Sequence, residues 1–226
     1  MMTSKEAARV IDISAVRTPH TLADIEKVVG YAKEYGFINV HVLPEWVKAL
    51  AELLEDVDGI YAGAPVGFPS GAHRIETKLL ETKLLVADGV KEMDIMMNIG
   101  RFKNKEYDHV LDELKQIIGL TPENVLTKVI IEINTLEDDE IEKACELAIA
   151  SGADFIKTGT GWIPGDANIK RIKQMKRICG NRIKIKAAGG VRTPQEFLEL
   201  FELGVERFGI NTKSAIEIVE YFKVRE

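Results

Sequence analysis

The sequence is poor in the features that mark secreted and membrane proteins. Of its 226 residues only Cys145 and Cys179 are cysteines, and they form neither a C-x-x-C motif nor a cluster of metal ligands. Two unclustered cysteines are typical of proteins of the reducing cytoplasm. No apolar run approaches the roughly 18 residues of a membrane span, and the first residues lack the apolar core of a signal peptide. We therefore expect a cytoplasmic protein with no membrane association.

An excess of positive charge and a histidine cluster are missing as well. The formal net charge is −6, which argues against a general binder of nucleic acids or anionic membranes. The histidines show no metal-ligand spacing; they are His20, His41, His73 and His109. We therefore expect neither a metal nor another cofactor.

What is present is a regular alternation of strand-like and helix-like segments. Strands are expected at residues 9–13, 37–42, 59–66, 92–97 and 125–133, up to Lys157, around Lys186, and at 206–210. Helices are expected at 21–35, from Pro44, up to about residue 88, at 105–118, 137–151 and 166–178, from Pro194, and from about Ser214. Eight strand–helix units predict an α/β fold, a single (β/α)8 TIM barrel, with residues 1–226 as one catalytic domain. The alternative, an open doubly wound sheet, requires a G-x-G-x-x-G after the first strand, and residues 14–19 contain none.

In such a barrel the active site lies at the C-terminal ends of the strands. The polar residues expected there are Asp12, His41, Asp94, Asn98, Glu132, Lys157, Lys186 and Asn211. Lys157 alone could equally reach solvent at its strand end. Lys186, however, ends another strand about one strand–helix unit later, so parallel pairing would hold the two amines close together. Burial and a nearby like charge both lower a lysine pKa, and a neutral lysine is the nucleophile that forms Schiff bases with carbonyl substrates.

Asp94 is the third candidate for chemistry. It shares its side of the fourth strand with Met96 and Asn98, and an inward carboxylate in so apolar a strand needs a cationic or hydrogen-bonding partner. The two lysines can supply one, either in a buried ion pair or, as we prefer, in a catalytic arrangement where the carboxylate relays protons beside an imine. Lys128 and Glu132 share one side of the fifth strand, and we expect them to extend the charged network in a structural role.

Glycine loops follow the last two expected strands. Gly189, Gly190 and Gly209 can present backbone N–H groups to a phosphate, together with the N-termini of the helices that follow. Barrel enzymes often bind phosphate at this place. A phosphate site here is therefore a hypothesis that needs support from other residues.

Three motifs together resemble the deoxyribose-phosphate aldolase family: Asp94-Ile-Met-Met-Asn-Ile-Gly100, Lys157-Thr-Gly-Thr-Gly161 and Lys186-Ala-Ala-Gly-Gly-Val-Arg-Thr193. The similarity covers nearly the whole chain, including Val66-Gly-Phe-Pro-Ser-Gly71 and Glu76-Thr-Lys78. It implies a metal-independent class I aldolase that forms a homo-oligomer, a dimer or tetramer. It also implies that Lys157 forms the Schiff base, that Lys186 perturbs its pKa, and that Asp94 relays protons through a water. Residues implied to line the substrate site are Thr160, Gly161, Gly189 and Gly190.

Other positions depart from the family pattern. The opening Asp12-Ile-Ser-Ala15 replaces a usual Asp-His-Thr-Leu, and His41 replaces a usual cysteine. Lys184 replaces a commonly small residue and would add positive charge if it pointed inward. The serines that help to hold phosphate in the family are Asn211 and Thr212 here. The further substrate-binding residues that we expect in this altered set are Asp12, His41, Gly209, Asn211 and Thr212.

The expected reaction is the reversible cleavage of 2-deoxy-D-ribose 5-phosphate to acetaldehyde and D-glyceraldehyde 3-phosphate through a lysine Schiff base. A related Schiff-base aldolase acting on another phosphorylated or acidic sugar is the main alternative. Two further alternatives are a barrel isomerase or decarboxylase, in which the paired lysines are incidental, and a non-enzymatic binding protein that keeps an old site. The intact set of Asp94, Lys157 and Lys186 argues against the last of these.

Overall fold

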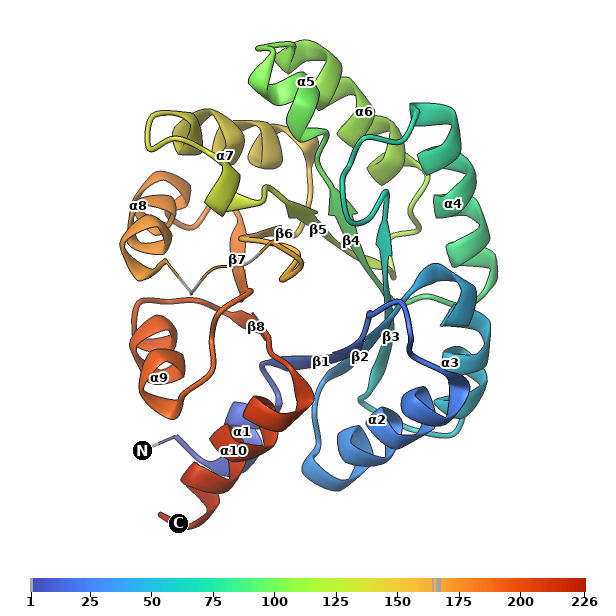
Figure 1. The fold of residues 1–226 in the computed structure, drawn as a ribbon, viewed down its shortest axis with the longest axis vertical. Coiled ribbons are helices and arrows are strands. Elements are labelled where there is room, and N and C mark those ends of the chain that lie inside the picture. The colour runs from blue at the N-terminus through green and yellow to red at the C-terminus, as the bar shows by residue number, and fades with distance from the viewer. Residues whose placement is uncertain (1, 164, 166–167) are drawn as a thin grey trace.

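Eight parallel strands close into one barrel in the computed structural model, which describes residues 2–163, 165 and 168–226. Each strand pairs with its neighbours in sequence, and β8 pairs with β1. The strands are β1 (Ile11–Ala15), β2 (Asn39–Val42), β3 (Tyr61–Val66), β4 (Glu92–Met96), β5 (Leu126–Ile130), β6 (Phe155–Lys157), β7 (Lys184–Ala188) and β8 (Arg207–Gly209). The helices surround the barrel (Figure 1), so the fold is the single (β/α)8 TIM barrel that the sequence predicts.

Several helices begin where the sequence offers a capping side chain. Thr21 and Thr193 each form a capping box with the residue three positions on, and Pro194 occupies a favoured first-turn position. The helices are α1 (Ser4–Ala8), α2 (Leu22–Tyr35), α3 (Val47–Leu53), α4 (Ile75–Ala87), α5 (Ile99–Lys103), α6 (Tyr107–Gly119), α7 (Glu140–Ser151), α8 (Ile169–Cys179), α9 (Pro194–Glu202) and α10 (Thr212–Lys223), with short 3-10 turns η1 (Pro44–Trp46) and η2 (Ile133–Thr135). The start predicted for α8 at residue 166 lies outside the described residues. In the described part of the chain, no helix combines the length and apolarity that crossing a membrane requires.

The short helix α1 was missed by the sequence analysis. Thr3 caps it, because its hydroxyl accepts from the backbone of Glu6 while the Glu6 carboxylate accepts from the backbone of Thr3. The helix packs beside α10, which brings the two chain ends to one side of the barrel (Figure 1). Because α1 ends only at Ala8, β1 begins at Ile11, two residues later than the predicted 9–13.

The fifth strand is shorter than predicted. It ends at Ile130, and Glu132 has a left-handed backbone conformation with φ of 48°, which interrupts the extended chain before η2. The alternation of side chains is therefore broken, and Glu132 does not continue the side of the strand that carries Lys128. Another addition is α5, which begins beyond Asn98 because the Asn98 side chain accepts from the backbone of Arg101.

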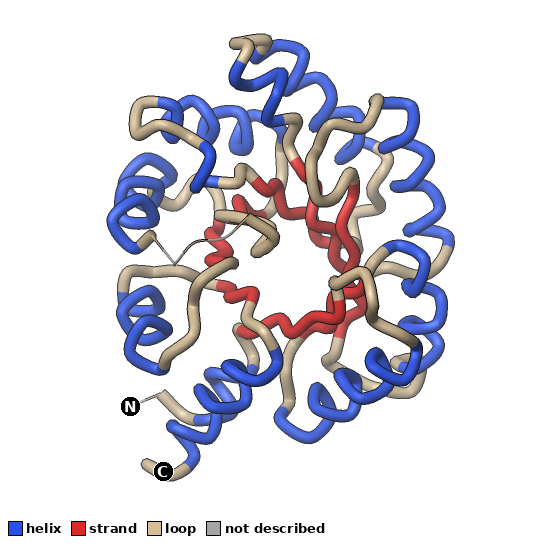
Figure 2. The backbone as a smooth tube through the Cα atoms, in the orientation of Figure 1, coloured by secondary structure: helices blue, strands red, loops and turns tan. Residues whose placement is uncertain are grey.

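The two sides of the barrel wall differ in polarity. Most outward-facing strand residues are apolar, buried, and packed against the helices; they include Ile13, Val40, Ala64, Ile95, Val129, Ile156, Ala187 and Phe208. Figure 2 shows the strands as an inner ring within the helices. The inward-facing residues include buried polar and charged side chains: Asp12, Asn39, His41, Glu92, Asp94, Lys128, Lys157, Lys186 and Arg207. Bulky apolar residues usually fill such a barrel, so its charged interior requires an explanation beyond packing.

The two cysteines lie together, although their positions in the sequence gave no sign of it. Cys145 on α7 and Cys179 on α8 are buried, free thiols that hydrogen-bond to each other. They belong to the apolar contact between the two helices.

Candidate active site

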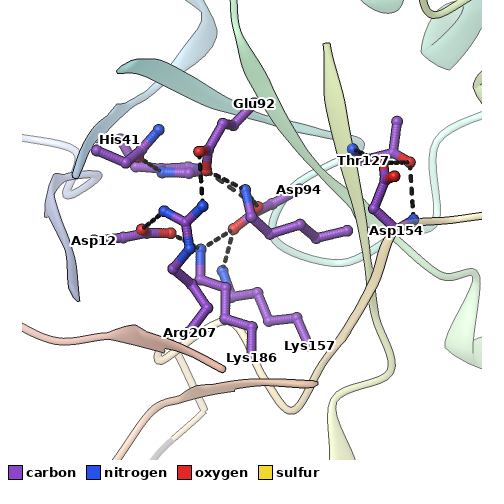
Figure 3. Close-up of polar contacts among 11 residues, drawn as sticks. Asp12, His41, Glu92, Asp94, Thr127, Asp154, Lys157, Lys186 and Arg207 are labelled. Atoms are coloured by element: carbon purple, nitrogen blue, oxygen red, sulfur yellow. Dashed lines mark hydrogen bonds and ion pairs between the residues drawn. The ribbon is translucent and has the colours of Figure 1, made fainter. Parts of the chain in front are cut away.

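Lys157 and Lys186 point into the barrel from adjacent strands. Lys157 ends β6 and is the direct partner of Lys186 in the parallel pairing with β7. The Nζ atoms of Lys157 and Lys186 lie 2.7 and 2.9 Å from one oxygen, Oδ2 of Asp94 (Figure 3). The structure therefore brings together the three residues that the sequence nominated for catalysis.

Asp94 is fully buried and surrounded by positive groups. Its Oδ1 atom lies 3.2 Å from Lys128 Nζ and 3.2 Å from His41 Nε2. Burial alone would raise the pKa of Asp94, but His41, Lys128, Lys157 and Lys186 together hold that pKa well below its ordinary value. The carboxylate is therefore ionised throughout the neutral pH range.

The amine of Lys157 loses its proton far more easily than a lysine in water. Burial is the main cause that lowers its pKa to about 8; the charge of Lys186 adds to the effect, and Asp94 opposes it. A useful fraction of Lys157 is then the free amine near neutral pH. The side chain still opens into a cavity, because Lys157 is one of the residues that line it.

A second set of ion pairs lies beside these groups in the barrel interior (Figure 3). Arg207 on β8 contacts Asp12 at 2.8 Å and Glu92 at 3.0 Å. Asp12 also contacts Lys186 at 2.6 Å, and Glu92 contacts Lys128 at 2.6 Å. Each carboxylate thus has two cationic partners, which compensates for the cost of burying it. Lys128 extends the charged network as the sequence analysis expected, and Asp12 serves this network through both of its oxygens.

His41 is held in one orientation by two polar neighbours. Burial lowers its pKa despite the opposing charge of Asp94, so the imidazole is neutral at pH 7. Nε2 of His41 lies 3.2 Å from Oδ1 of Asp94, and Nδ1 contacts the side-chain oxygen of Asn39.

Two glycines make room for these side chains. A Cβ atom on Gly63 would lie 2.4 Å from Cε1 of His41, so a larger residue in β3 would displace the imidazole. A Cβ atom on Gly209 would lie 2.9 Å from the Cβ of Ala188 and 3.4 Å from Cε of Lys186. The sequence therefore places its smallest residue where the site needs space.

A cavity of about 790 Å³ opens above the lysines at the C-terminal end of the barrel. All the residues predicted for the site line it: Asp12, His41, Asp94, Lys157, Thr160, Gly161, Lys186, Gly189, Gly190, Gly209, Asn211 and Thr212. Asn98 and Glu132, which the barrel rule also selected, are not among the lining residues; Asn98 caps α5. Lys184 stays apart from the cluster, because it is exposed and its Nζ lies over the ring of Phe155.

Some polar side chains at the cavity are engaged by the protein itself. Glu132 accepts from both the hydroxyl and the backbone N–H of Thr160, so it fixes the loop that follows β6. The side-chain oxygen of Asn211 accepts from the backbone of Ser214 and caps α10. Asn211 therefore orients the helix N-terminus with its oxygen, and Thr212 is the first residue of that helix.

Three charged residues at the site were not predicted from the sequence. Glu92 lies two residues before Asp94 on the same side of β4, and that spacing was an available signal. Arg207 lies in a short apolar strand, where a buried guanidinium needs a carboxylate. Arg17 lies at the mouth, where its guanidinium donates to the backbone oxygen of Gly161 at 2.8 Å and lies 5.4 Å from the ring of Trp162.

Comparisons with known proteins agree with this arrangement. A family model described as DeoC/LacD family aldolase matches residues 4–209. The deoxyribose-phosphate aldolase of Rhizobium meliloti (strain 1021) is 40% identical over 216 residues, covering 95% of this chain and 86% of that protein. The deoxyribose-phosphate aldolase of Thermococcus kodakarensis is 38% identical over 221 residues, covering 97% of this chain and 98% of that protein.

Solved structures show the same similarity. The aldolase QR15 superimposes with a TM-score of 0.91 at 35% identity, over 97% of each chain. A deoxyribose phosphate aldolase from Aeropyrum pernix shares the fold with a TM-score of 0.89 at 23% identity, over 99% of this chain and 94% of that one. The family model, the curated relatives and the paired lysines at the barrel mouth agree: the chain belongs to the DeoC/LacD family of aldolases.

Proposed function

We propose that this chain is a class I aldolase that reversibly cleaves 2-deoxy-D-ribose 5-phosphate to acetaldehyde and D-glyceraldehyde 3-phosphate. The observation that carries the proposal is the buried amine of Lys157, whose pKa is lowered to about 8, beside Lys186 and 2.7 Å from Asp94. The relatives named above are themselves deoxyribose-phosphate aldolases, which supports the choice of substrate.

The first half of the reaction builds an electron sink. The free amine of Lys157 attacks the aldehyde carbon C1 of the open-chain sugar, and the resulting carbinolamine loses water to give a protonated imine. The C2–C3 bond then breaks, and its electron pair moves into the imine to form an enamine. The C3 hydroxyl gives up its proton, so C3 becomes the aldehyde carbon of glyceraldehyde 3-phosphate.

The second half returns the enzyme to its starting state. The enamine takes up a proton at C2, and hydrolysis of the imine releases acetaldehyde and the amine of Lys157. In our proposal Asp94 relays these protons through a water molecule, with Lys186 as the neighbouring donor. The contacts of Asp94 Oδ2 with both lysine nitrogens support this role, because they place the carboxylate beside the reacting atom.

The phosphate would lie beside the glycine loops that follow β7 and β8. Gly189, Gly190 and Gly209 line the cavity, and so does Thr212 at the N-terminus of α10, where backbone N–H groups can donate to an anion. The hydroxyl of Thr212 is an additional donor. The NH2 group of Asn211, the part of that side chain that could donate to an anion, already donates to the hydroxyl of Ser214 at 3.1 Å. The side-chain contribution to anion binding is therefore reduced, which favours a related phosphorylated or acidic sugar as the second candidate substrate.

We further propose a homo-oligomer, a dimer or tetramer, located in the cytoplasm. Leu80 and Leu84 lie one turn apart on α4 and are 58% and 56% exposed. Exposed apolar pairs of this kind suit contact with a second copy of the chain. Light scattering should show an oligomer, and a Leu80→Glu, Leu84→Glu variant should shift it towards the monomer; a monomeric parent protein would overturn the idea.

The function is tested by following both products. Purified protein incubated with 2-deoxy-D-ribose 5-phosphate should release acetaldehyde and glyceraldehyde 3-phosphate in equal amounts, and EDTA should leave the rate unchanged. Formation of an isomerised sugar phosphate without acetaldehyde would instead indicate an isomerase. Loss of the rate with EDTA would indicate a metal-dependent reaction.

A further inference from the structure

The ion pairs inside the barrel close into a ring of alternating charge. Passing from one contact to the next, its members are Arg207, Asp12, Lys186, Asp94, Lys128 and Glu92. All of them are buried, with at most 6% of their surface exposed. Three cations and three carboxylates alternate, so the ring as a whole carries no net charge.

Lys157 stands outside this ring and attaches to it at one point. Its Nζ contacts Asp94 Oδ2 at 2.7 Å, the same oxygen that Lys186 reaches at 2.9 Å. Asp94 therefore has one more cationic partner than the ring requires. When Lys157 is protonated the described interior carries one surplus positive charge, and when it is neutral the charges balance.

We infer that Arg207 and Glu92 are positioning residues that set the protonation of Lys157 from the far side of the ring. Neither residue lines the cavity, so neither can act on the substrate directly. Arg207 balances Asp12 and Glu92, while Glu92 balances Arg207 and Lys128. This inference rests on the proposed Schiff-base role of Lys157.

The sign of the effect follows from the charge balance. Without the charge of Arg207 the ring becomes negative, and Lys157 holds its proton to higher pH. Without the charge of Glu92 the ring becomes positive, and Lys157 releases its proton at lower pH. Along the ring Glu92 is three contacts from Lys157 and Arg207 is four. A unit charge removed at roughly 10 Å shifts a titration by about one pH unit at an effective dielectric constant of about 20.

The other groups that face Lys157 do not replace this control. His41 on β2 is neutral at pH 7, and β3 contributes Gly63 and Pro65 on the inward side. Glu132 beyond β5 is bonded to Thr160, and Lys184 at the start of β7 is exposed. Among the described residues, the remaining charges that face Lys157 from the strands are the members of the ring.

The test compares Arg207→Met, Arg207→Lys and Glu92→Gln with the parent protein. Each is incubated with acetaldehyde and cyanoborohydride, and the rate of alkylation at Lys157 is followed by mass spectrometry across pH. The midpoint should rise by about one pH unit in Arg207→Met and fall by about one in Glu92→Gln. Arg207→Lys keeps the charge and should stay near the parent value. The double variant Arg207→Met, Glu92→Gln is neutral again and should return towards it.

The outcomes separate the ring from the proposed function. Midpoints that stay fixed while rates fall, or that move in the same direction in Arg207→Met and Glu92→Gln, overturn the inference, because loss of packing cannot produce opposite shifts. If circular dichroism shows that Arg207→Met does not fold, Glu92→Gln provides the test alone. An alkylation midpoint of Lys157 that is not lowered in Glu92→Gln then refutes the inference. Absence of any adduct on Lys157 in the parent protein refutes the Schiff-base proposal instead.

Discussion

Lys157 and Lys186 are direct partners in the parallel register of β6 and β7, so both amines rise at the same height inside the barrel. One carboxylate oxygen of Asp94 serves both of them. Two lysines that share one acceptor cannot both remain fully protonated at little cost, and it is Lys157 whose pKa falls, to about 8.

The variant Lys186→Leu should shift the pH dependence of the reaction. Burial is the largest cause of the lowered pKa of Lys157 and will remain, but the charge of Lys186, which also lowers it, will be gone. The pKa of Lys157 should therefore rise, and the rate, which needs the free amine, should reach its half-maximum at higher pH. The matched control is Lys184→Leu on the same strand, whose exposed side chain should leave the profile in place. A profile that does not move in Lys186→Leu would limit Lys186 to geometry or hydrogen bonding.

The variant Asp94→Asn should lose both activity and stability. It leaves the buried charges of Lys128 and Lys186 short of a partner, a change that typically costs about 3–5 kcal/mol. Loss of the proton relay should reduce kcat by roughly a hundredfold or more. Urea denaturation and steady-state kinetics measure the two effects. Asp154→Asn is the control, since Asp154 is exposed and bonds Thr127 away from the lysines; an equal loss of kcat there would contradict a specific role for Asp94.

The variant Gly63→Ala should displace His41. The new Cβ would lie 2.4 Å from the imidazole, so the imidazole must move, and overpacking of this kind costs about 1–3 kcal/mol. Thermal unfolding should show the loss, and part of it should disappear in Gly63→Ala, His41→Ala, where the imidazole is gone but Oδ1 of Asn39, 2.8 Å from the new Cβ, remains. Gly30→Ala on α2, where nothing lies within 4 Å of the new Cβ, should be neutral or stabilising. If Gly63→Ala lost the same stability with and without His41, the imidazole would not be the obstacle.

The sequence predicted the barrel and the catalytic candidates for local reasons. Lys157 and Lys186 each end a strand before a glycine loop, and barrel topology then places them side by side. The ring of ion pairs could not be predicted in this way. Arg207 on β8 contacts Glu92 on β4 across the closed barrel, and these two strands are not adjacent. The prediction that Glu132 shares a side of β5 with Lys128 was wrong for a different reason. The left-handed backbone of Glu132 ends the alternation of side chains in that strand.

Anion recognition should appear as a difference between substrates. If backbone N–H groups near Gly189 and Gly190 and at the start of α10 bind phosphate, kcat/KM should be higher for 2-deoxy-D-ribose 5-phosphate than for 2-deoxy-D-ribose. The ratio of the two values should correspond to several kcal/mol of transition-state binding, at about 1.4 kcal/mol for each tenfold. Lys213→Ala should change this difference little, because the Lys213 side chain is 87% exposed and lies near Glu217. Equal values of kcat/KM for the two sugars would refute an anion site at these glycines and the start of α10.

In the proposed reaction Lys157 forms a covalent imine with the substrate. Borohydride added to the protein with 2-deoxy-D-ribose 5-phosphate should reduce that imine and leave a permanent adduct, which peptide mass spectrometry should locate on Lys157. The parent protein should lose activity as the adduct forms, and Lys157→Ala should take up no adduct at the site. An adduct found on Lys186 alone, or full activity in Lys157→Ala, would show that Lys157 is not the residue that forms the imine.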